Sequence, residues 1–269
     1  MLARSALLLG RRGWLYLAAS AACLAPLALF RALAPSVWTW TGLVGDGPRD
    51  DLISSGIFVG SAYVACTVLA MASVPGLVLG DLSGVRIAWR SWVSGCLGPF
   101  LFFFCASPLL FLLSMATFGM CVLTLVPLLV DLDALGPSAM DYVALVLCCA
   151  IGLGLPLLIV GNVFLRGNGR AVQETARRFP AEALEGPTAV HRRRLLFLGF
   201  PLLTAYVSLP AFIEFEHRIA LDPGTVFWWL FAAEALLLTL WAVVATASWH
   251  ATYGRVYAPP ETELADAFD

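Results

Sequence analysis

Few side chains in this sequence are of types that do chemistry within apolar surroundings, and Glu234 is the clearest of them. It lies about eight residues into an uncharged stretch, residues 226–250, that is long enough to cross a bilayer. A carboxylate at that depth is costly in lipid and usually faces a bundle interior or a water-filled cavity. Glu234 is therefore a candidate proton or substrate site on an intramembrane pathway. The alternative is a protonated or hydrogen-bonded packing residue with Tyr206 or Thr204 as its partner.

Two further groups of charged residues lie outside the apolar stretches. Asp81, Arg86 and Arg90 fall between the apolar stretches 52–79 and 92–115, and we predict that they couple the chain to a cytoplasmic partner. Another apolar stretch, 195–213, is preceded directly by Arg192, Arg193 and Arg194. Arginines at that place are well positioned to contact anionic lipid head groups. A docking surface for a cytoplasmic protein is the other interpretation of this basic segment.

The remaining chemistry-bearing residue types predict neither a metal site nor a cofactor site. The three histidines fall in loops or at a boundary, so no pair is placed to hold a haem within the bilayer. Motifs for intramembrane proteolysis or lipid synthesis are not found, and we expect a non-enzyme. The cysteines all lie in apolar sequence without a C-x-x-C spacing and are expected to be small buried hydrophobes: Cys23, Cys66, Cys96, Cys105, Cys121, Cys148 and Cys149.

All 16 basic residues are arginine, and the lack of lysine excludes two kinds of chemistry. The chain cannot form a lysine Schiff base. It also cannot carry the phosphate loop whose lysine reaches the nucleotide phosphates. Any work driven by ATP must therefore be powered by a partner.

The composition points to lipid as the main solvent of this chain. Of its 269 residues, 60% are hydrophobic and 13% are charged, whereas soluble domains are near half apolar and a quarter charged. No soluble stretch is long enough to fold independently. We predict an all-α, multi-pass membrane protein whose residues 1–269 form a single transmembrane domain, with membrane lipids and no nucleic acid among its partners.

Charge-free runs and the arginine distribution predict the topology. Thirteen arginines fall on one side and three on the other, so the positive-inside rule places both termini in the cytoplasm. Tryptophans near the predicted boundaries agree with this assignment. We expect the inner membrane of a bacterium. The six predicted spans are residues 13–34, 52–79, 92–115, 141–165, 195–213 and 226–250.

The segments between and beside the spans carry their own predictions. Residues 1–12 are expected to form an amphipathic helix on the inner surface. Residues 116–130 are expected to be re-entrant or interfacial, with the break at Gly119, because two spans there would move the basic loop outside. That loop, 166–194, is cytoplasmic, and Asn168 is predicted to cap a short helix within it. The acidic tail, 256–269, is expected to be disordered.

Prolines and small residues within the spans are expected to shape the helices. Each proline removes a backbone hydrogen bond and kinks its helix, so the proline-free sixth span is expected to be the straight one. The G-x-x-x-G of Gly56 and Gly60 and the small-residue face of Ala150, Gly152 and Gly154 predict close helix packing within the chain, with a dimer seam as the alternative.

The basic start at 1–12 and the segment Gly80-Asp81-Leu82-Ser83-Gly84-Val85-Arg86-Ile87-Ala88-Trp89 resemble the ABC-2 type of ABC-transporter permease. In that family an acidic, glycine-containing segment joins the second and third spans and contacts the ATPase subunit. The resemblance implies a permease of six helices with both ends inside, energised by a separate cytoplasmic ATPase and working as a homodimer or hetero-oligomer.

Two other assignments remain open. Asp141-Tyr142-Val143-Ala144-Leu145-Val146-Leu147, followed by Gly152 to Pro156, is similar to the fourth span of the TatC translocase family. That resemblance implies a protein translocase with small single-span partners. The third possibility is a structural subunit of a larger respiratory or photosynthetic complex, because such a subunit also needs no ligands or catalytic motifs of its own.

Overall fold

A computed structural model describes residues 2–33, 49–84, 87, 89–129, 139–176, 199–209 and 223–253. Every regular element in these ranges is a helix, so the all-α prediction is confirmed for this part of the chain. The elements are α1 (Leu2–Leu33), α3 (Arg49–Ser83), α4 (Trp89–Trp92), the π-helix η1 (Val93–Leu97), α5 (Gly98–Cys105), α6 (Ser107–Leu129), α7 (Ala139–Cys149), the π-helix η2 (Ala150–Gly154), α8 (Leu155–Ala176) and α10 (Pro223–Tyr253). A further helix, Gly199–Leu209, precedes α10.

Five helical segments in the described ranges are long and apolar enough to cross a membrane, which indicates a multi-pass membrane protein. They are Leu8–Leu29, Gly60–Ser83, Ser107–Thr124, Met140–Val172 and Trp228–His250. The fifth predicted span appears only as the shorter helix Gly199–Leu209.

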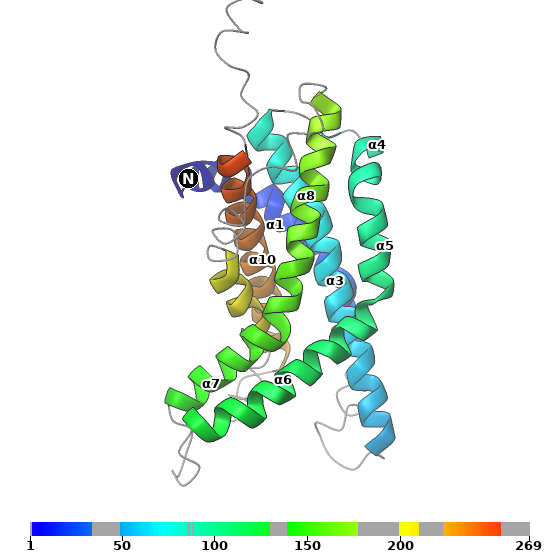
Figure 1. Ribbon diagram of the computed structural model, residues 1–269, viewed down its shortest axis with the longest axis vertical. Helices are drawn as coiled ribbons and strands as arrows, with labels where there is room; N and C mark the ends of the chain where they lie inside the picture. The colour runs from blue at the N-terminus through cyan, green and yellow to red at the C-terminus, as the bar shows by residue number, and fades with distance from the viewer. Residues whose placement is uncertain are drawn as a thin grey trace, which may run out of the picture.

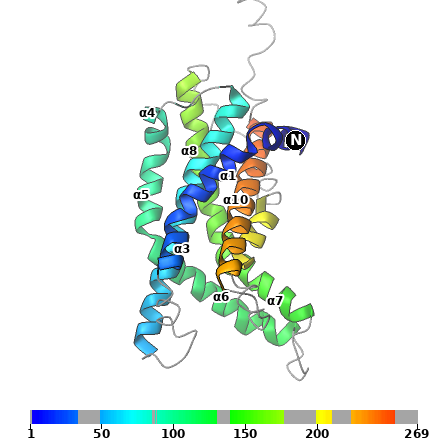
Figure 2. The ribbon, with the colours of Figure 1, turned by 180° about the vertical axis from the view of Figure 1, so that it is seen from behind.

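The helices form a bundle with one oblique pair. Helices α1, α3, α8 and α10 run along the long axis, and α4, η1 and α5 lie on the far side of α8 from α10 (Figure 1). α1 packs against α10 and α3 (Figure 2), and α3 also packs against α8 and α6. Helices α6 and α7 pair with each other and run obliquely across one end of the bundle. The beginning of α4 and the end of α8 therefore lie at the same end of the molecule.

The core lies where α1, α3, α8 and α10 meet. Its largest fully buried side chains include Trp241, Tyr16, Phe164 and Met71. By contrast, only 11% of the residues in the most apolar window of α6 are buried inside the molecule. Such a surface is ordinary for a helix in lipid, whose tails are as apolar as leucine.

Both π-helices precede a proline by the same spacing. Leu97 ends η1 two residues before Pro99, and Gly154 ends η2 two residues before Pro156. A proline has no N–H for the carbonyl four residues earlier, which here belongs to Gly95 or Gly152, and its ring crowds that carbonyl. The backbone widens instead, and in η2 the N–H of Leu155 donates to the carbonyl oxygen of Ala150, five residues back.

A third proline explains where the long apolar segment after α4 bends. α5 and α6 are separated at Ala106, whose backbone has φ −82° and ψ 0°, just before Pro108. The predicted break at Gly119 is wrong, because Gly119 lies inside the continuous helix α6. A glycine costs a helix only about 1 kcal/mol relative to alanine. Helix α10, which has no proline after Pro223, runs unbroken over 31 residues, as predicted for the sixth span.

Glycines let the helices approach closely, as the small-residue pattern predicts for packing within the chain. A Cβ on Gly60 would lie 2.1 Å from the ring of Phe111 in α6, and one on Gly152 would lie 2.8 Å from the Cα of Phe118. The two π-helices also occupy such positions: a Cβ on Gly95 of η1 would lie 2.5 Å from the carbonyl oxygen of Gly167 in α8. These contacts place α6 directly against η2, and η1 directly against α8.

Two predicted segment boundaries are wrong. The predicted helix 1–12 is not separate from the first span, because α1 runs unbroken from Leu2 to Leu33; its first turns project sideways from the bundle (Figure 1). The basic segment 166–194 does not begin as a loop, since α8 continues to Ala176. Asn168 is consequently inside a helix, so the prediction that it caps one is also wrong.

Several predictions fall on residues outside the described ranges. These are the basic triplet Arg192, Arg193 and Arg194, the candidate coupling residue Arg86, and the acidic tail 256–269.

Candidate functional site

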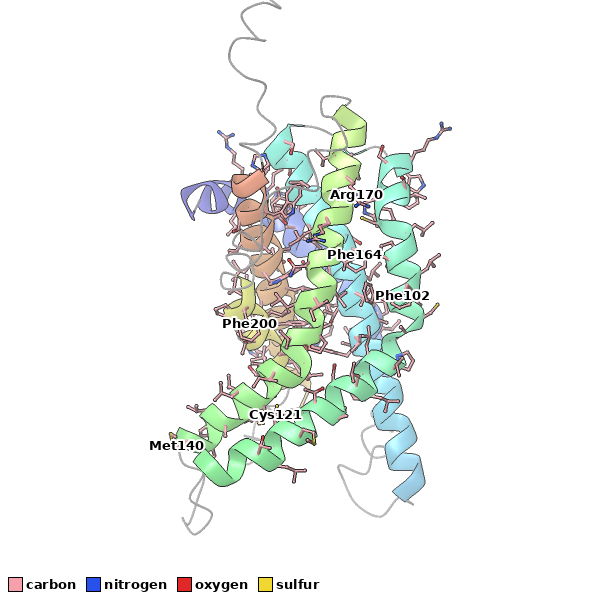
Figure 3. The ribbon with its side chains drawn as sticks, in the orientation of Figure 1. Phe102, Cys121, Met140, Phe164, Arg170 and Phe200 are labelled. Atoms are coloured by element: carbon pink, nitrogen blue, oxygen red, sulfur yellow. The ribbon has the colours of Figure 1, made fainter. Side chains whose placement is uncertain are left out.

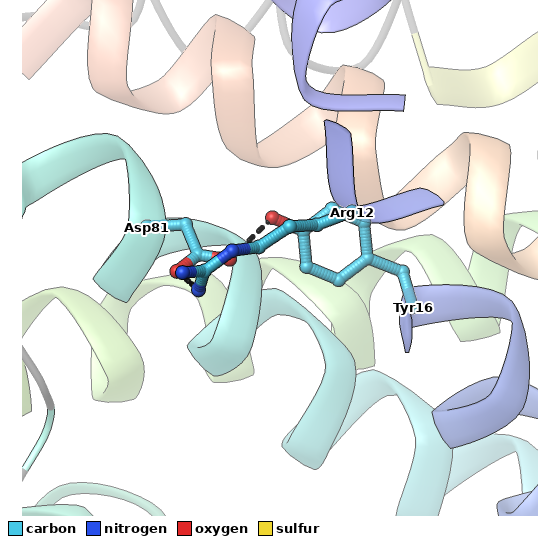
Figure 4. Close-up of polar contacts among 3 residues, drawn as sticks. All are labelled: Arg12, Tyr16 and Asp81. Atoms are coloured by element: carbon cyan, nitrogen blue, oxygen red, sulfur yellow. Dashed lines mark hydrogen bonds and ion pairs between the residues drawn. The ribbon is translucent and has the colours of Figure 1, made fainter. Parts of the chain in front are cut away.

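The end of α3 is tied to α1 by a small polar cluster made of Arg12, Tyr16 and Asp81 (Figure 4). The guanidinium Nη1 of Arg12 forms an ion pair with Oδ1 of Asp81. The hydroxyl of Tyr16 donates a hydrogen bond to the other carboxylate oxygen, Oδ2, over 2.6 Å. Both carboxylate oxygens of Asp81 are therefore held by side chains of one helix.

The sequence brings these groups together by simple helical spacing. Arg12 and Tyr16 are four residues apart on α1 and share one face of it. Asp81 lies in the last turn of α3, which ends at Ser83 because Gly84 takes a φ of +65° that terminates the helix. The segment that resembles a loop between spans thus begins as the final turn of α3.

Burial decides which of the two contacts is the stronger. The side chain of Arg12 is 59% exposed and that of Asp81 is 22% exposed, so solvent weakens the ion pair. Tyr16 is completely buried. A hydrogen bond from a buried hydroxyl to a carboxylate contributes about 1.5–3 kcal/mol, more than an exposed ion pair does.

Arg90, another candidate coupling residue, does not pair with this cluster. Arg90 is exposed on α4, next to Trp89, whose side chain is 72% exposed. Arg86 lies outside the described residues. Asp81 is therefore an anchor between two helices, and Arg90 is the solvent-facing charge at the start of α4.

Glu234 lies in α10 and is completely buried, as expected for a carboxylate that faces the bundle interior. It takes part in a polar or electrostatic interaction. The prediction that Thr204 partners it is wrong, since the buried hydroxyl of Thr204 makes no hydrogen bond. The hydroxyl of Tyr206 shares a 2.8 Å hydrogen bond with the hydroxyl of Thr67 in α3.

Two further contacts between helices involve tyrosine rings and buried hydroxyl groups. The ring of Tyr206 stacks on that of Tyr63, with the centroids 5.5 Å apart. On the other side of α10, the buried hydroxyl of Thr239 donates to the hydroxyl of Ser20 in α1 over 2.8 Å. Hydroxyl groups thus join α3 to the helix Gly199–Leu209 and α10 to α1.

Asn168 is a buried polar residue whose role the sequence does not reveal. Its amide nitrogen donates over 3.0 Å to the carbonyl oxygen of Ala72 in α3, which also accepts a 3.3 Å hydrogen bond from the indole of Trp92. Ala72 lies next to Met71, whose carbonyl loses its helical donor because Pro75 has no N–H. The only available signal was a polar amide between two glycines, in Gly167-Asn168-Gly169.

The acidic, histidine and cysteine side chains of the described ranges are the candidates for a metal site. These ranges contain no group of three histidine, cysteine or acidic residues that could hold a metal ion. Five cysteines are buried as expected, while Cys105 is exposed and Cys121 is half-buried.

Comparisons with family models, with curated proteins and with solved structures found no match to this chain.

Proposed function

We propose that this chain is the membrane-spanning permease subunit of an ATP-driven transporter of the ABC-2 type, in a bacterial inner membrane. The observation that carries the proposal is the tie of Arg12 and Tyr16 to Asp81. It links the end of α3, the place where a cytoplasmic partner would dock, to α1, whose first turns project sideways from the bundle.

The proposed mechanism starts at the corner between α3 and α4. A soluble ATPase docks there through Arg90 and Trp89, which are exposed on α4. Closure of the ATPases on ATP pushes this corner. The anchored carboxylate of Asp81 transmits the displacement to α1, so that α1 and α3 move together and one bundle rocks against its partner subunit.

The proposed pathway passes the buried hydroxyl groups and Glu234. A completely buried carboxylate is expensive in a membrane protein and is usually retained for function. In the proposal Glu234 contacts the transported molecule or its proton once the bundles separate. Six crossings, with the helix Gly199–Leu209 forming part of the fifth, keep both termini on the ATPase side.

Site-specific photocrosslinking tests the docking corner. A photoreactive amino acid at position 90 is expected to crosslink the chain to an ATPase subunit in native membranes. The control position is Trp229, which lies near the start of α10 and is also exposed, at 72%. Crosslinks from position 229 to the ATPase, or none from position 90, would contradict the proposed docking corner.

A further inference from the structure

One side of α8 carries arginines where its neighbours leave it uncovered. Three consecutive residues of α8 face three different partners: Gly167 meets η1, Asn168 meets α3, and Gly169 meets Trp249 of α10. Arg166 and Arg170 occupy the remaining side, and both are exposed.

Toward the N-terminal end of α8, the same side of the helix is apolar. Leu155 is 46% exposed and Ile159 is 57% exposed. Leu155, Ile159, Arg166 and Arg170 follow one another at helical spacing along this face. The face therefore changes from aliphatic to cationic within two turns, near the upper end of α8 where Arg170 is labelled in Figure 3.

The depth of Arg166 makes this arrangement unusual. Asn168 is level with Ala72, which precedes the end of α3 at Ser83 by eleven residues, or about 16 Å along a helix. An arginine facing lipid at that level must extend toward the interface or find an anion. In the described part of the chain, neither Arg166 nor Arg170 forms an ion pair or a hydrogen bond.

We propose that Arg166 and Arg170 bind the phosphate of an anionic phospholipid in the leaflet at this end of the molecule. Two guanidinium groups one helical turn apart offer several donors to phosphate oxygens in a fork geometry. The acyl chains lie along Ile159 and Leu155. That apolar continuation is why the ligand is a lipid and not a soluble phosphate.

Native mass spectrometry of the detergent-solubilised full chain tests the site on the unaltered protein first. Phosphatidylglycerol is expected to remain bound in preference to phosphatidylcholine with the same acyl chains. Equal retention of the two lipids would overturn the proposal. Inorganic phosphate is expected not to displace the lipid, and displacement would assign the site to a soluble anion instead.

The variants R166Q and R170Q locate the binding to these residues. Each is expected to weaken the preference for phosphatidylglycerol about fivefold, in line with the usual contribution of a basic residue near an anionic surface. R11Q is the matched control, because Arg11 is exposed on α1, which makes no extensive contact with α8. An equal loss in R11Q would show that only net charge matters and would overturn the proposed site.

Discussion

Asp81 accepts a hydrogen bond from the buried Tyr16 and pairs with the exposed Arg12, and the first contact is expected to stabilise the fold more than the second. Asp81→Asn keeps the shape and removes the charge, so it is expected to lower the free energy of unfolding by about 1–2 kcal/mol. Tyr16→Phe is expected to have a similar effect, and Arg12→Gln a smaller one because Arg12 is exposed. Thermal unfolding in detergent measures all three. A double-mutant cycle of Tyr16 and Asp81 with no coupling energy would disprove the assigned bond.

Asn168 is expected to stabilise the contact between α8 and α3 through the carbonyl oxygen of Ala72. Asn168→Leu removes the amide donor and leaves that carbonyl with fewer partners, which costs about 1–3 kcal/mol. Asn162→Leu in the same helix is the control, because Asn162 is only half-buried and forms no such bond. Equal unfolding temperatures for the two variants would contradict this role.

At the residue scale the sequence identifies charges better than their partners. Glu234 is correctly expected to face the interior, because burial follows from a carboxylate within an apolar run. The pairing of Tyr16 with Asp81 does not follow from the sequence, since the two residues are 65 positions apart. Asn168 was misassigned because an asparagine next to glycines also fits a helix cap.

At the scale of elements, the packing of η2 on α6 is expected to depend on Gly152 and not on Gly119. A Cβ on Gly152 would lie 2.7 Å from Cβ of Phe118 and 2.8 Å from its Cα, whereas Gly119 has no atom within 4 Å of such a position. Gly152→Ala is expected to cost about 1–3 kcal/mol through overpacking. Gly119→Ala is expected to be neutral or to stabilise by up to about 1 kcal/mol.

Unfolding temperatures of the two alanine variants, measured under the same conditions, check this difference. If Gly152→Ala were as stable as Gly119→Ala, the close packing of η2 on α6 would be refuted.

The same elements show what sequence patterns can and cannot locate. The prolines predict only some of the interruptions, because α1 and α3 run unbroken through Pro26 and Pro75. Where a helix is interrupted, the form of the interruption depends on the neighbouring helix. Pro99 and Pro156 produce π-helices where Gly95 and Gly152 meet another helix, whereas Pro108 follows an open bend at Ala106. Apolar runs alone do not contain this information, which is why the predicted break was placed at Gly119.

For the whole molecule, the number of crossings decides where the C-terminus lies. The helix Gly199–Leu209 has 11 residues and is about 16 Å long, which is too short to cross the hydrocarbon core by itself. Six crossings require its flanking sequence to complete the span. We expect a reporter fused after Asp269 to be fluorescent as green fluorescent protein and inactive as alkaline phosphatase. An active phosphatase fusion would indicate five crossings.

At this scale the composition indicates a membrane protein, and the long charge-free runs indicate helices, because a helix needs about 20 apolar residues to cross the hydrocarbon core. The packing order of the helices does not follow from composition. It depends on the matching of Gly60, Gly152 and Gly167 with particular side chains and backbones on other helices.

The central claim is that a separate ATPase powers this chain. Purification of the tagged full-length protein from its native membrane in mild detergent, with quantitative mass spectrometry of its companions, tests that claim most directly. A stoichiometric ATPase subunit that carries a lysine-containing phosphate loop is expected among these companions. Electron-transfer subunits with bound cofactors, in the absence of any ATPase, would contradict it and identify the chain as a structural subunit.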